Sequence, residues 1–138
     1  MTRREIRDNA FKLIFEQSIR GDDIEELYET AEEVDEITVD DDVKKIVEGT
    51  ISHSEEIDGI ISGYSKSRSI SRISKVNLAI LRIAIYEALH DDRTPVNVAI
   101  SEAVRLAEVY TYAEDISFIN GVLGSFSRDL GRKEAENA

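Results

Sequence analysis

Arginine side chains near the start of the chain give the clearest sign of chemistry in this sequence. Arg3, Arg4 and Arg7 lie within a first stretch of twenty residues that holds five basic and three acidic side chains. Residues 65–75, SKSRSISRISK, add four basic side chains and no acidic one. Because basic side chains neutralise phosphate groups, both patches are candidates for contact with a nucleic acid. The alternative is that both are only solvated surfaces.

Side chains that perform catalysis or bind metals are scarce. The absence of cysteine excludes disulfides, thiolate nucleophiles and zinc–cysteine clusters. His90, Asp91 and Asp92 could form an acid–base or metal cluster, but His90 also suits the end of a helix. The run Asp40–Asp42 suits a helix start better than a metal site, because adjacent helical residues point in different directions. The sequence therefore predicts no enzyme, no metal site and no cofactor.

Few residues break helices, which predicts an all-α fold. The chain of 138 residues has one proline and seven glycines. Apolar residues recur at a spacing of three and four, which predicts helices over residues 3–19, 24–35, 43–62, 75–90, 96–110 and 116–130. We expect six or seven helices in a single domain spanning residues 1–138. Its N-terminal helices should lie within about 3–62 and its C-terminal helices within about 74–131.

The stretch KVNLAILRIAIYEALH, residues 75–90, is apolar around nearly its whole circumference. A helix of this kind is buried at the centre of a bundle. Glu87 interrupts the apolar surface, so it needs a basic partner in this chain or in another protein. Arg82 is the nearest base along the helix, but it does not lie on the face of Glu87.

The stretch ISFINGVLGSF, Ile116–Phe126, combines a hairpin signal with a helical one. Asn-Gly favours a tight turn between two strands, yet no alternating strand pattern flanks it. The apolar spacing on both sides favours a helix, so we predict one. Ser117, Gly121 and Gly124 fall on one side of it, which predicts the close approach of another helix or of a ligand backbone.

Charge and hydropathy limit the classes of partner. Between residues 22 and 58 there are 16 acidic side chains and two lysines, and the formal net charge of the whole chain is −12. This overall charge repels nucleic acid and argues against nonspecific binding. The start of the chain lacks the apolar run of a signal peptide, and no segment has the apolar length of a membrane helix. We expect a cytoplasmic protein without membrane contact.

Three segments resemble the NusB family of bacterial transcription antitermination factors. They are AILRIAIYEAL at 79–89, TPVNVAISEAVRLAEVY at 94–110 and AEDISFINGVLGSF at 113–126, and they occur in the order and spacing of that family. The basic start TRREIRDNAFKLIF also looks like the family's first helix. The resemblance implies an all-helical fold of two small sub-bundles.

The resemblance also implies a function. It implies an RNA-binding antitermination factor that binds boxA RNA together with ribosomal protein NusE. The pair would act in the RNA polymerase elongation complex with other Nus factors and support transcription of ribosomal RNA. The alternative function is an acidic helical adaptor or homo-oligomer that binds proteins only. Contiguous basic surfaces would favour RNA binding, and widely separated ones would favour the adaptor. A homodimer of the free protein stays open.

Carried over by residue, the resemblance assigns two sets of contacts. Two of the assigned residues have a second interpretation: Asp115 has the position of a helix cap, and Glu87 could pair with a basic side chain of this chain. Arginine and aromatic side chains suit single-stranded RNA, because they bind phosphates and stack on bases. The implied RNA-binding residues are Arg3, Arg4, Arg7, Asp115 and Phe118, and the implied partner-binding residues are Phe15 and Glu87.

Overall fold

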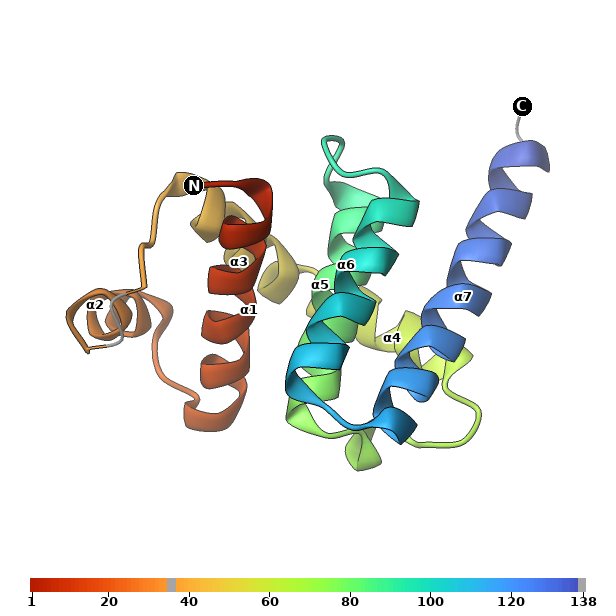
Figure 1. The fold of residues 1–138 in the computed structure, drawn as a ribbon, viewed down its shortest axis with the longest axis horizontal. Helices are drawn as coiled ribbons and strands as arrows, with labels where there is room; N and C mark the ends of the chain where they lie inside the picture. The colour runs from red at the N-terminus through yellow and green to blue at the C-terminus, as the bar shows by residue number, and fades with distance from the viewer. Residues whose placement is uncertain (35–36, 137–138) are drawn as a thin grey trace.

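The computed structural model describes residues 1–34 and 37–136 of the chain, and it is all-helical there (Figure 1). The prediction of an all-α fold with six or seven helices is confirmed, since the described residues form seven α-helices. A short 3-10 turn, η1 (Ile70–Arg72), lies between the fourth and fifth. The helices are α1 (Arg3–Arg20), α2 (Ile24–Val34), α3 (Asp41–Ser52), α4 (Ser54–Tyr64), α5 (Lys75–His90), α6 (Val96–Tyr110) and α7 (Ala113–Glu136).

Polar side chains cap three of the helices where the sequence indicates a start. Thr2 accepts a hydrogen bond from the backbone N–H of Glu5, and Ser74 caps α5 in the same way. Asp40 accepts from the N–H of Val43 at the start of α3. These acceptors satisfy backbone donors that have no partner within the helix.

The helix predicted over residues 43–62 is two helices. The break falls at His53, which ends α3 and precedes α4. Its backbone N–H donates to the carbonyl of Gly49, 3.1 Å away, and its ring Nδ1 lies 2.8 Å from the same oxygen. The backbone bond is the ordinary helical bond of the last turn of α3, and the ring contact adds a local side-chain bond to the same carbonyl, of the kind that competes with helix continuation.

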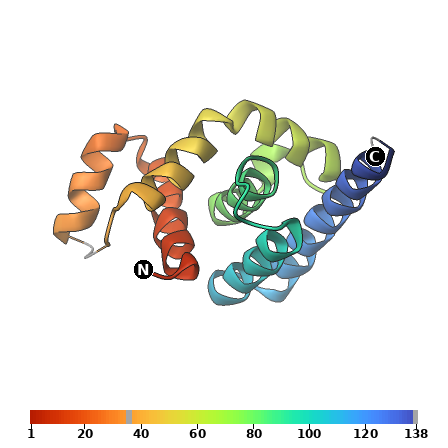
Figure 2. The ribbon, with the colours of Figure 1, turned by 90° about the horizontal axis from the view of Figure 1, so that it is seen from above.

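Helix α5 lies at the centre of the molecule, with α1, α2 and α3 to one side and α4, α6 and α7 to the other (Figures 1 and 2). It packs against α1, α3, α4, α6 and α7, which explains why it is apolar on nearly every face. One hydrophobic cluster draws residues from all seven helices. Helix α4 packs against α5 and α7, although the sequence grouped its residues with the N-terminal helices.

Helix α7 runs through the Asn-Gly pair without a break. Ile119, Val122 and Phe126 are buried, as the helical pattern predicts. The expected close approach at the glycines is wrong. A Cβ on Gly121 would meet nothing within 4 Å, and one on Gly124 would meet only Nη1 of Arg128. This side of α7 faces solvent.

No helix within the described ranges combines the length and the apolar character that crossing a membrane requires.

Candidate nucleic-acid interface

Arg7 joins three helices through a buried ion pair. From α1 its Nε and Nη2 donate to the two carboxylate oxygens of Glu87 on α5, at 2.6 and 2.8 Å. Its Nη1 donates to Oε1 of Glu102 on α6, at 3.0 Å. The side chains of Arg7 and Glu87 are 4% and 1% exposed. Burial lowers the pKa of Arg7, but the hydrogen bonds and charges of the two glutamates outweigh it and raise the pKa.

This pair corrects two of the sequence-based assignments. Arg7 cannot reach an RNA phosphate and Glu87 cannot reach a partner protein, because each is enclosed and bonded to the other. The expectation that Glu87 needs a basic partner is confirmed. Its partner lies 80 positions away in the sequence, so no periodic pattern could identify it.

Arg3 and Arg4 stay partly exposed beside this buried pair. Nη2 of Arg3 donates to Asp91 at 2.8 Å and to Thr94 at 3.2 Å. Arg4 donates from Nε and Nη2 to the two oxygens of Glu102, at 2.9 and 3.0 Å, and its side chain is 62% exposed. Both arginines are therefore accessible to a ligand, but each already pairs with a carboxylate.

The carboxylates that hold these arginines have lowered pKa values, which favours their charged form. For Asp91, burial raises the pKa, but the backbone N–H of Arg93 and the charge of Arg3 outweigh burial and lower it. For Glu102, burial likewise raises the pKa, but hydrogen bonds from Arg4 and Arg105 outweigh burial and lower it. These ion pairs hold the start of α1 against the α5–α6 connection, through Asp91, and against α6, through Glu102.

Asp115 and Phe118 lie together at the start of α7 and share a third residue that the sequence did not assign. Arg68 places its guanidinium carbon 4.3 Å from the centre of the Phe118 ring, and its Nη1 donates to Asp115 at 3.0 Å. Asp115 also accepts from Nδ2 of the buried Asn77, at 2.9 Å. The hydrogen bond from Arg68 is the main cause that lowers the pKa of Asp115. Phe118 is half-buried.

The two sets of candidate residues lie at opposite ends of α5. Arg3 contacts Asp91, just beyond the end of α5, and Arg4 contacts Glu102 in the middle of α6, whereas Asp115 contacts Asn77 near the start of α5. The sixteen residues of α5 separate them by roughly 24 Å at a rise of 1.5 Å per residue. The basic patches at the start of the chain and at residues 65–75 are thus not contiguous. By the criterion given above, this separation favours the adaptor.

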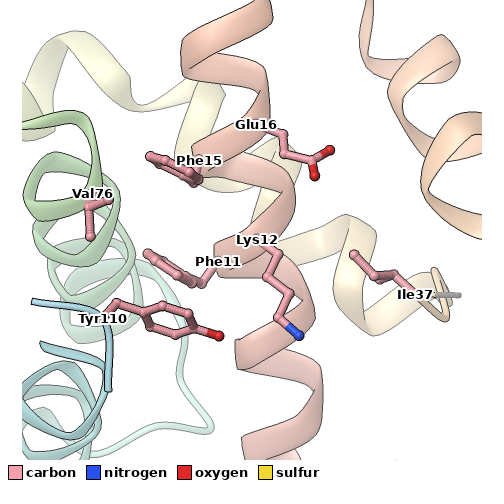
Figure 3. A pocket seen from close by; sticks show the side chains of 7 residues that line it. All are labelled: Phe11, Lys12, Phe15, Glu16, Ile37, Val76 and Tyr110. Carbon is pink, nitrogen blue, oxygen red and sulfur yellow. The ribbon is translucent and has the colours of Figure 1, made fainter. Parts of the chain in front are cut away.

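Phe15 lines an apolar pocket between α1 and the start of α5 (Figure 3). The pocket has a volume of about 350 Å³. Phe15 stacks on Phe11 with ring centres 6.3 Å apart, and Phe11 lies 5.0 Å from the ring of Tyr110 at the end of α6. Tyr110 is 44% exposed and the neighbouring Val109 is 62% exposed. An apolar surface of this kind suits a protein partner.

The histidines and aspartates do not assemble a catalytic or metal centre. His90 turns toward Glu56, with Nε2 to Oε1 at 2.7 Å, and stacks on His53. Asp91 turns instead toward Arg3. Across residues 1–34 and 37–136 there is no group of three or more metal-binding side chains.

Comparison with known proteins places the chain in a family. The NusB family model matches residues 4–128. A transcription antitermination protein NusB from Acetivibrio thermocellus is 48% identical over 126 residues, covering 90% of this chain and 87% of that protein. One from Clostridium botulinum is 38% identical and covers 90% of this chain and 98% of that protein. These relatives are named for transcription antitermination and not for a reaction, in agreement with the prediction that the chain is not an enzyme.

Solved structures agree. NusB from T. maritima superposes with a TM-score of 0.79 at 29% identity, covering 93% of this chain and 92% of that chain. The crystal structure of antitermination factors NusB and NusE in complex with double-stranded RNA contains a chain that superposes with a TM-score of 0.80 at 28% identity. The match covers 92% of this chain and 96% of that chain. The family match spans almost the whole described fold, and the chain belongs to the NusB family of transcription antitermination factors.

Proposed function

We propose that this protein binds boxA RNA together with ribosomal protein NusE within the RNA polymerase elongation complex, where other Nus factors act with it and transcription of ribosomal RNA is supported. It would act in the bacterial cytoplasm, where transcripts are made. The observation that carries the proposal is the aromatic and charged group of Phe118, Arg68 and Asp115 on a NusB fold. The structural relative in complex with NusE and RNA supports the same function.

The RNA contacts would come from both ends of α5. At the start of α7, Phe118 offers a ring for stacking with a base, and Asp115 fixes the guanidinium that covers the ring. At the start of α1, Arg3 and Arg4 are exposed enough to reach phosphates. A single strand that follows both ends would touch both groups, so the separation of the patches is compatible with one extended ligand.

The protein contact would use the apolar pocket around Phe15. Its rings come from α1 and α6, and exposed apolar side chains continue the surface on both helices. NusE would cover this surface and leave the arginines at the start of α1 accessible. Self-association of the free protein through the same surface is the competing arrangement, and size-exclusion chromatography with and without NusE separates the two.

The test is a binding titration with boxA RNA at stated salt, with and without NusE. Phe118→Leu should lower RNA affinity about tenfold, because a stacked base contributes about 1–3 kcal/mol. Phe118→Tyr keeps the ring and serves as the matched control with near wild-type affinity. Neither variant should change the salt dependence, because stacking releases no counterions.

The adaptor is the second candidate, and the separated basic patches are the observation that favours it. An adaptor would bind NusE with high affinity and would show no RNA binding, either alone or together with NusE. This result would overturn the proposed RNA function while leaving the family assignment intact.

A further inference from the structure

We propose that the connection between α4 and α5 is the principal contact with the RNA backbone. Lys66 and Arg72 would bind phosphates on either side of a base held at Phe118. This inference rests on the RNA binding proposed above and adds residues that the resemblance does not assign. It also assigns most of the electrostatic attraction to this segment and only a small part to the start of α1.

The first observation is the state of the charges. Within the described part of the chain, Lys66 and Arg72 are exposed and form no ion pair, and Lys75 donates only to the backbone carbonyl of Ser18, at 2.9 Å. Arg68 alone in this segment has a carboxylate partner. At the start of α1, by contrast, Arg3 and Arg4 each contact a carboxylate. Within the described residues, the α4–α5 connection therefore carries two exposed cations, Lys66 and Arg72, that no carboxylate compensates.

The second observation is where the connection lies. Arg68 fixes its middle to the start of α7 through Asp115 and Phe118. Lys66, two residues earlier, lines a surface pocket of about 600 Å³ together with Arg128 and Arg132 of α7. Cations thus continue from the Phe118 ring along one side of α7. Figure 1 shows the connection beside the lower part of that helix.

The acidic groups near this surface are already engaged. Asp115 accepts from Arg68, and Asp129 accepts from the hydroxyl of Tyr64 at 2.7 Å and from Arg132 at 3.1 Å. Among these contacts no carboxylate pairs with Lys66, Arg72 or Arg128. A phosphate entering here would not have to displace a bound carboxylate.

The pairing of the cations decides which basic patch contributes more to RNA affinity. A phosphate that binds Arg4 must replace Glu102, which exchanges one anion for another. A phosphate that binds Lys66 or Arg72 neutralises a free cation and releases counterions from the RNA. The net charge of −12 opposes both, but screening over about 8 Å at physiological salt lets the nearest charges dominate.

The experiment measures boxA RNA affinity across a salt series in the presence of NusE. The double variant Lys66→Gln/Arg72→Gln should bind about tenfold more weakly at 0.15 M salt, and the log–log slope should flatten by about 1.4, at about 0.7 per contact with a single strand. The control Lys44→Gln/Lys45→Gln makes the same change of net charge on α3, away from the connection, and should keep the wild-type slope. Melting temperatures confirm that both variants fold.

Each other outcome is informative. If the wild-type protein binds RNA and the double variant keeps its slope, the inference is wrong and the proposed function stands. In that case Arg3→Gln/Arg4→Gln should carry the slope change. If the double variant loses NusE affinity and keeps its RNA affinity, the connection contacts the protein partner and the inference is overturned. If the wild-type protein binds no RNA, the proposed function fails together with the inference.

Discussion

Arg7 carries its charge at a position that water hardly reaches. The desolvation of a buried ion costs several kcal/mol, and only good geometry compensates it. Here the guanidinium donates three hydrogen bonds to two carboxylates, and Thr94 adds a hydrogen bond to Glu87 at 3.0 Å. The group is therefore satisfied as a unit, and removal of one member leaves the others without compensation.

The first prediction follows from this dependence. Arg7→Met should lower the free energy of unfolding by about 3–5 kcal/mol, because Glu87 would stay buried without its main partner. Denaturant unfolding followed by circular dichroism measures the change. Arg20→Met on the same helix is the control, with an exposed side chain and an expected change within about 0.5 kcal/mol. Equal stability of the two variants would show that the buried pair contributes nothing.

The second prediction concerns pH. The pKa values of Asp91 and Glu102 are lower in the folded chain than their ordinary values of 3.8 and 4.5. Their contribution to stability is therefore complete above those ordinary values, and it is lost as the pH falls through the lower values of the folded state. We expect Asp91→Asn to make the acid loss of stability less steep below about pH 4. The control is Asp92→Asn at the exposed neighbour, which should leave the steepness unchanged; a match between the two variants would contradict the assignment.

At the scale of the element, glycines on two helices have opposite surroundings. A Cβ added to Gly121, inside α7, would have no neighbour within 4 Å, while the same atom on Gly49 of α3 would overlap the ring of Tyr86. Gly costs about 1 kcal/mol relative to Ala in a helix interior. Gly49 allows α3 to pack against Tyr86 of α5, whereas Gly121 lowers helix propensity without allowing a close contact.

The third prediction uses this contrast. Gly121→Ala should raise the free energy of unfolding by about 0.5–1 kcal/mol, because it adds helix propensity without a clash. Gly49→Ala should lower it by about 1–3 kcal/mol through overpacking against Tyr86. Thermal unfolding of both variants under one set of conditions measures the pair. A destabilising Gly121→Ala would restore the close approach that the sequence suggested.

Local patterns explain which elements could be predicted. The caps at Thr2, Asp40 and Ser74 depend on residues three positions away, and the central position of α5 follows from its composition, so both could be inferred. The break at His53 depends on hydrogen bonds to Gly49 that no periodicity reveals. The pairing of Arg7 with Glu87 joins distant segments, and the candidate site was misassigned there for that reason.

At the scale of the whole molecule, α1 presents different chemistry along its length. Arg3 and Arg4 lie at its start, and the apolar pocket around Phe11 and Phe15 lies farther along it. If the proposed contacts hold, one rigid helix carries both, and RNA and a protein partner would bind at the same time without competing for a side chain. This arrangement suits a factor that joins a transcript to a second protein.

The fourth prediction separates these surfaces. Phe15→Ala should weaken NusE binding about tenfold, because it removes a half-buried ring from the apolar pocket, and it should leave the RNA salt slope unchanged. Calorimetry with purified NusE measures the affinity. Leu130→Ala, which truncates a half-buried apolar side chain on α7 away from the pocket, is the control and should bind normally. Equal losses for both variants would show that the pocket around Phe15 is not the partner surface.

The long separation between Arg7 and its carboxylates also bears on how the protein is made. Helix α1 is synthesised before α5 and α6, and Glu87 and Glu102 follow Arg7 by 80 and 95 residues. Until α6 has been translated, the guanidinium of Arg7 lacks both carboxylates, and α1 cannot take its final place against α5 and α6. Arg3 and Arg4 depend on the same late partners. A truncated nascent chain would thus display these arginines without the geometry of the finished protein.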